Sequence, residues 1–124
     1  MMIKLKVLPM AIPSEIVALI DRLNQELNET EQGAIRGLTI IRPLLTRFGD
    51  NPMLIRHFAY FNNSLLLVEF SRNKIDTIIE RISSDEVNEQ QIQEAGEDLG
   101  EQLGRLLEAK INIRSIISTW EELL

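Results

Sequence analysis

The stretch from residue 52 to residue 82 constrains the fold most, because its apolar side chains recur in steps of three and four. This spacing places them on one side of a helix and is typical of a seam that packs against other helices. Residues 65–70 are apolar almost all round, which indicates cover from more than one side. The seam comprises Leu54, Phe58, Phe61, Leu65, Val68, Arg72, Ile75, Ile79 and Ile82. All of these residues are apolar except Arg72.

The composition of the 124-residue chain indicates a single soluble domain. Hydrophobic residues make up 44% of it, which excludes general disorder, and the net charge of −6 disfavours nucleic-acid binding. No apolar run approaches the roughly 18 residues of a membrane span, and residues 1–9 lack the apolar core of a signal peptide. The chain has no cysteine, so it has no thiolate chemistry. We therefore expect one cytoplasmic domain over residues 1–124, with no membrane segment.

The first helix is predicted over residues 14–48, after the helix-entry residue Pro13. Polar residues 28–32 interrupt its apolar stripe without a proline. The region is therefore either one continuous helix, which we prefer because its residues are good helix formers, or two helices divided near 28–32. Pro43 lies inside this helix and should kink it. The stripe comprises Ile16, Ile20, Leu23, Leu27, Ala34, Leu38, Ile41, Leu45 and Phe48.

Two short connections flank the central helix. The sequence Gly-Asp-Asn-Pro at 49–52 predicts a left-handed glycine after the first helix, then an N-cap, then a proline in the first turn of the next helix. The last helix is predicted over about 88–123, with a capping box formed by Asn88 and Gln91 or by Ser83 and Glu86. Its seam comprises Ile92, Gly96, Leu99, Leu103, Leu106, Lys110, Ile113, Ile117, Trp120 and Leu124.

The predicted fold is all-α, an antiparallel up-down-up bundle of three long helices, or of four if the first is broken. Residues 3–7 alternate apolar and basic side chains, so we expect residues 1–12 to form an extended N-terminal arm, either frayed or lying on a partner subunit. Such long helices enclose little interior, so the remaining apolar positions suggest a second subunit and hence a homodimer. Those positions are Ile55, Leu66, Leu67, Phe70, Ile78, Ile111 and Ile116.

Glycines recur at fourth positions in two of the predicted helices. Each glycine inside a helix costs about 1 kcal/mol relative to alanine, so the repeat needs a reason in packing or in binding. The packing interpretation places aromatic rings of the central helix (Phe58, Phe61), or another backbone, over the glycines. The binding interpretation is a groove for a partner helix or a flat ligand. The candidates for this close contact or groove are Gly33, Gly37, Gly96, Gly100 and Gly104.

Charged residues gather in two further regions. The acids of 85–108 include Glu94, Glu97, Asp98 and Glu101, but a di-iron bundle would need paired Glu-x-x-His motifs, and the single histidine, His57, has no such partner. We read these acids as a solvated face and expect no metal, no cofactor and no catalytic site. The arginines of 36–56 suit pairing with acids of neighbouring helices or docking to an acidic partner: Arg36, Arg42, Arg47 and Arg56.

Glu69 and Arg72 stand out because they are charged members of an apolar helix. They are three residues apart, so an ion pair between them is feasible, and a charged pair in a seam often selects register or oligomeric state. We place the candidate subunit interface on the same part of the helix. It comprises Leu66, Leu67, Phe70, Glu69 and Arg72.

Residues 58–63 (FAYFNN) and 93–100 (QEAGEDLG) resemble stretches of a family of short helical proteins from cyanobacteria, some labelled RNase E-like. The resemblance covers most of the chain and implies a helical protein, but carries no functional residue. Its labels imply nucleic-acid processing. We expect a non-enzymatic, self-associating helical-bundle interaction protein. The alternatives are an accessory subunit of an RNA-processing complex that docks through the arginines, or a small-ligand binder in a glycine-lined groove.

Overall fold

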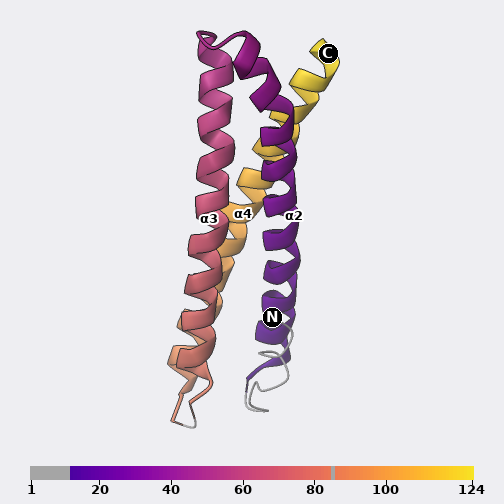
Figure 1. Ribbon diagram of the computed structural model, residues 1–124. Coiled ribbons are helices and arrows are strands. Elements are labelled where there is room, and N and C mark those ends of the chain that lie inside the picture. Colours follow the sequence, from indigo (N-terminus) through magenta and orange to yellow (C-terminus); the bar gives the residue numbers. More distant parts are fainter. Residues whose placement is uncertain (1–11, 85) are drawn as a thin grey trace.

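A computed structural model describes residues 12–84 and 86–124 of the chain. Over these residues the chain forms three α-helices and no strand: α2 (Ser14–Arg47), α3 (Pro52–Ile82) and α4 (Glu89–Leu123). The helices run up, down and up, and each packs against the other two (Figure 1). The predicted all-α bundle of three long helices is confirmed. Of the predicted N-terminal arm, residues 1–11 lie outside the described residues, and Ile12 is buried.

Helix α2 is continuous across residues 28–32, so the four-helix alternative is wrong. Its seam passes through the interruption because Thr30, which is fully buried, lies between Leu27 and Ala34 on the same face. Pro43 lies one turn from the helix end and leaves the carbonyl of Thr39 without its usual backbone donor. In Figure 1 the last turns of α2 lean towards the start of α3.

The α2–α3 connection owes its geometry to Asn51. Its side chain accepts hydrogen bonds from the backbone N–H groups of Met53 (2.9 Å) and Leu54 (3.1 Å), and Pro52 occupies the first helical position. The expectation of a left-handed glycine is wrong, because Gly49 does not have a positive φ. Helix α2 ends instead at Arg47, and the residue that caps it, Phe48, has a φ of −129°.

The α3–α4 connection ends in a capping box. The Asn88 side chain accepts from the Gln91 backbone N–H at 2.9 Å, and the Gln91 side chain accepts from the Asn88 backbone N–H at 2.9 Å. The first of the two predicted capping boxes is therefore the one that forms, and it fixes the start of α4 at Glu89.

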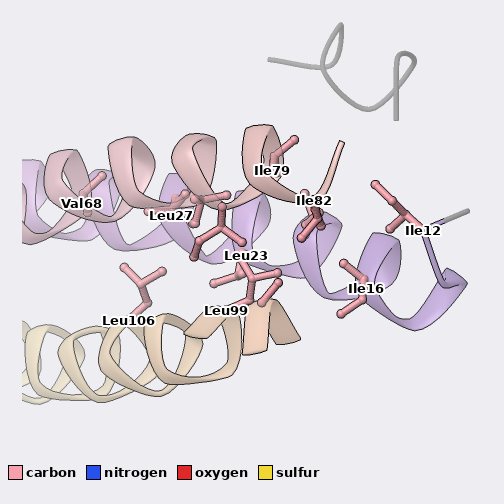
Figure 2. Close-up of a cluster of buried hydrophobic side chains, with 13 residues drawn as sticks. Ile12, Ile16, Leu23, Leu27, Val68, Ile79, Ile82, Leu99 and Leu106 are labelled. Carbon is pink, nitrogen blue, oxygen red and sulfur yellow. The ribbon is translucent and has the colours of Figure 1, made fainter. Parts of the chain in front are cut away.

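The buried apolar side chains form two clusters, one towards each end of the bundle. The first cluster lies at the end where α2 begins, and Figure 2 shows side chains of all three helices meeting in it. Its members are Ile12, Ile16, Ile20, Leu23, Leu27, Val68, Ile75, Ile78, Ile79, Ile82, Ala95, Leu99 and Leu106. The second cluster comprises Ala34, Leu38, Ile41, Leu54, Phe61, Ile113, Ile117 and Trp120.

Two predicted apolar seam residues, Phe48 and Leu124, are largely exposed. Phe48 is 52% exposed because α2 ends at Arg47, before the seam reaches it. Leu124 is 76% exposed because it follows the last residue of α4. In contrast, Ile78 is only 2% exposed, so its own chain already covers it and it is not left over for a second subunit.

Candidate functional site

Polar side chains, which range from fully buried to exposed, gather near the boundary between the two apolar clusters. We call this set the polar belt, and it draws on all three helices. Burial of a polar group is costly unless a partner satisfies it, so each member restricts how the helices can be aligned. The polar belt comprises Glu26, Asn28, Glu29, Thr30, Glu31, Ser71, Arg72, Gln102 and Lys110.

Lys110 links α4 to α2 within the polar belt. Its Nζ lies 2.5 Å from Glu26 Oε1 and 3.0 Å from Glu29 Oε1, and the side chains of Lys110 and Glu26 are only 13% and 10% exposed. The Glu26 carboxylate raises the pKa of Lys110 above its ordinary value, with help from Glu29 and against the effect of burial. Lys110 in turn lowers the pKa of Glu29. Lys110 and Glu29 are therefore charged at neutral pH.

Arg72 links α3 to α2. Its guanidinium donates to both carboxylate oxygens of Glu31, at 2.9 and 3.2 Å, and to Asn28 Oδ1 at 3.0 Å. Glu31 is held ionised, because its pKa is lowered chiefly by this hydrogen bond. The ion pair between Glu69 and Arg72 that the sequence made feasible does not form, because the Arg72 side chain points towards α2 and pairs with Glu31 there. A third link joins α3 to α4, where Ser71 Oγ donates to Gln102 Oε1 at 2.9 Å in a fully buried contact.

The candidate interface residues of α3 divide into two groups. Leu66 and Phe70 lie one turn apart and are 62% and 55% exposed, and Glu69 between them is exposed as well. Leu67 is half-buried and packs against the first cluster of its own chain. Arg72 belongs to the polar belt. The structure thus leaves Leu66 and Phe70 as the apolar pair on the outer face of α3.

The glycines of the repeated spacing lie in three different settings. An added Cβ at Gly37 would come within 2.4 Å of the Phe61 ring. At Gly33 and Gly96 it would meet isoleucine side chains at 3.1 and 3.2 Å, those of Ile113 and Ile16. The first three glycines therefore serve helix packing. At Gly100 and Gly104 nothing lies within 4 Å, and both are exposed on α4.

The contact between His57 and Trp120 was not predicted from the sequence. The indole N–H of Trp120 donates to His57 Nδ1 at 2.8 Å, and the two rings meet edge to face with their centroids 5.9 Å apart. Burial, and then the charge of Arg56, lower the pKa of His57. Trp120 was assigned to the α4 seam, but nothing in the spacing showed which residue of α3 lies opposite it.

Two of the arginines of 36–56 have partners within the chain. Arg36 makes an ion pair with Glu121 of α4, and Arg47 lies over the ring of Phe48, 5.5 Å from its centroid. Arg42 and Arg56 are exposed. Across the described parts of the chain, no group of His, Cys, Asp and Glu side chains is arranged to hold a metal ion. None of the described helices combines the length and apolar character needed to cross a membrane.

A groove of about 550 Å³ runs between α2 and α4 beside Lys110. Its wall includes Gly33, the paired Arg36 and Glu121, and Thr30, whose Oγ1 is buried and has no hydrogen-bond partner. This is the part of the structure closest to the glycine-lined groove expected from the sequence, although only one of the glycines lines it.

Comparison of the chain with protein-family models, with curated proteins and with solved structures gave no match. The resemblance to cyanobacterial helical proteins therefore stays an expectation. Function has to be argued from the geometry of the three helices alone.

Proposed function

We propose that this protein is a non-enzymatic helical interaction module that self-associates through the outer face of α3. The observation that carries the proposal is the pair Leu66 and Phe70, which project from the middle of a well-packed helix and stay more than half exposed. Side chains at i and i+4 lie above one another on a helix, so the two form one apolar surface. Because the chain itself already covers part of both side chains, burying the remainder against a partner would contribute less than the roughly 1.5–3 kcal/mol of a fully exposed side chain.

The polar belt supports the same proposal indirectly. The ion pairs of Lys110 and Arg72 with residues of α2 fix the axial positions of the three helices relative to one another. They therefore hold the outer face of α3 in one arrangement. A rigid surface loses little entropy on binding, which favours association through a small apolar area.

The test is the oligomeric state in analytical ultracentrifugation. We expect wild-type protein to dimerise, and we expect Leu66→Asp and Phe70→Asp to shift it to monomer while the circular dichroism of the folded chain is kept. The matched control is Ile111→Asp, because Ile111 is 63% exposed on α4 and lies away from α3. A wild-type monomer at high concentration, or a dimer indifferent to both α3 substitutions, would refute the proposal.

A second candidate is favoured by the groove between α2 and α4. Its buried, unpartnered Thr30 hydroxyl could accept a ligand's hydrogen bond, and Arg36 could hold a carboxylate if Glu121 were displaced. The check is an NMR titration with small carboxylic acids. Shifts around Thr30 that vanish in Thr30→Val would support binding, whereas unchanged spectra across the series would remove this candidate.

A further inference from the structure

The outer face of α3 carries a pattern of charge as well as an apolar pair. Leu66, Phe70, Asn73 and Thr77 follow in steps of four, three and four, which is the a/d spacing of a two-stranded coiled coil. With Phe70 at position a, the exposed seam has Asn63, Phe70 and Thr77 at a, and Ala59, Leu66 and Asn73 at d.

The flanks of this seam have opposite charges. On one flank the g positions hold Glu69 and Asp76, and on the other the e positions hold Lys74 and Arg81. Side chains at e and g lie beside the partner helix and decide its orientation. Among the described residues neither Glu69 nor Lys74 has an ion-pair or hydrogen-bond partner of its own chain.

From this pattern we infer that the partner of α3 is the α3 helix of a second copy, packed parallel and in register. The inference rests on the proposed self-association and adds its geometry. In a parallel pair each g residue meets the partner's e residue of the following heptad, five positions further on. Glu69 then meets Lys74 of the second copy, and Asp76 meets Arg81 of the second copy. By symmetry each of these ion pairs forms twice.

An antiparallel pair would reverse the electrostatics. It would bring g beside g and e beside e, so that acids would face acids and bases would face bases. Like charges placed opposite one another oppose association and so select against this orientation. The same flank charges therefore favour the parallel partner and disfavour the antiparallel one.

The surface has room for the predicted contacts. A groove of about 420 Å³ lies along the basic flank and is lined by residues that include Phe70, Lys74 and Arg81. Arg81 already pairs with Asp98 of its own chain at 3.2 Å, and its guanidinium has further N–H groups to share.

The orientation can be tested by disulfide cross-linking, because the chain contains no cysteine. Thr77→Cys places a thiol at an exposed a position, where two copies meet in the parallel arrangement, so we expect rapid homodimer cross-linking. In an antiparallel pair centred between Leu66 and Phe70, residue 77 would lie opposite Ala59. Cross-linking only in a mixture of Ala59→Cys and Thr77→Cys would therefore overturn the parallel geometry while leaving the self-association in place.

Charge exchange gives an independent measurement of the same pairs. Glu69→Lys turns two attractive contacts in the dimer into repulsive ones and should raise the dissociation constant about tenfold at low salt. Glu69→Lys combined with Lys74→Glu should restore it. Glu94→Lys is the control, since it changes the net charge equally on an exposed position of α4. If the double variant dimerises no better than Glu69→Lys, the proposed ion pairs are wrong. If only Leu66→Asp abolishes the dimer and the charge variants have no effect, the self-association is upheld and the parallel, in-register geometry is not.

Discussion

Gly37 of α2 and Phe61 of α3 pack closely against each other. Phe61 is fully buried in the second cluster, and its ring lies where a Cβ at position 37 would have to be. Glycine in a helix is unfavourable by roughly 0.5–1 kcal/mol relative to alanine, so its presence here reflects the space the ring needs. The aromatic-over-glycine packing considered from the sequence thus applies to this pair, but spacing alone could not say which glycine would receive a ring.

Gly37→Ala should therefore destabilise the protein. The clash with the Phe61 ring costs about 1–3 kcal/mol, which outweighs the gain in helix propensity. Gly104→Ala is the matched control, because its new Cβ meets nothing within 4 Å and should add stability. Urea denaturation of the two variants provides the measurement, and equal gains in both would show that the ring does not occupy the space at Gly37.

Stability should also depend on pH through His57. The folded state lowers the pKa of His57 below the ordinary value of 6.5, so the unfolded chain binds more protons as the pH falls through that value. The contribution of neutral His57 is therefore complete above about pH 6.5 and is lost as the pH falls towards the lower, folded pKa. Protonation also removes the Nδ1 acceptor that the Trp120 indole uses.

Because the chain has one histidine, an NMR titration reads this pKa directly. We expect a value below 6.5 in the folded protein, raised part of the way in Arg56→Gln, which removes the neighbouring positive charge. In His57→Gln the free energy of unfolding should depend less steeply on pH just below pH 6.5. A folded-state pKa at or above 6.5 would contradict this account of the His57 environment.

At the scale of the elements, the starts of α3 and α4 were predictable and the cross-helix pairs were not. Asn51 with Pro52, and Asn88 with Gln91, act within a few residues of chain, so their chemistry could be read locally. The pair of Arg72 with Glu31 depends on how far α3 is displaced along α2, which no local pattern encodes. From the sequence, the nearby Glu69 was therefore considered as the ion-pair partner of Arg72, whereas the partner in the structure is Glu31.

The pairs of the polar belt should behave as interdependent contacts between helices. Lys110→Met removes the cation from the buried Glu26 carboxylate and should cost about 3 kcal/mol at neutral pH. A double variant, Glu26→Leu with Lys110→Met, should recover most of the loss, because two apolar groups leave no buried charge. Additive losses in a denaturation cycle would show that the two side chains act independently.

At the scale of the whole molecule, the three helices form a rod, and the outer face of α3 carries the exposed apolar pair Leu66 and Phe70. Helix α2 spans 34 residues and is thus about 50 Å long. The periodicity of the sequence was enough to predict this rod, since one continuous seam per helix dictates the bundle. It left Leu66 and Phe70 as apolar residues beyond the seam, but their exposure became evident only once α2 and α4 were seen to pack on the other side of α3.

Association through the outer face of α3 predicts a particular shape in solution. A parallel side-by-side dimer keeps the length of one rod and grows only in cross-section, whereas end-to-end association would approach twice that length, about 100 Å. Small-angle X-ray scattering should therefore give wild-type protein and the monomeric Leu66→Asp variant similar maximum dimensions, with a larger cross-sectional radius for wild type. Residues 1–11 are present in both samples, so their contribution cancels in the comparison. A near doubling of the maximum dimension in the wild type would place the contact at the ends of the bundle and rule out the α3 face.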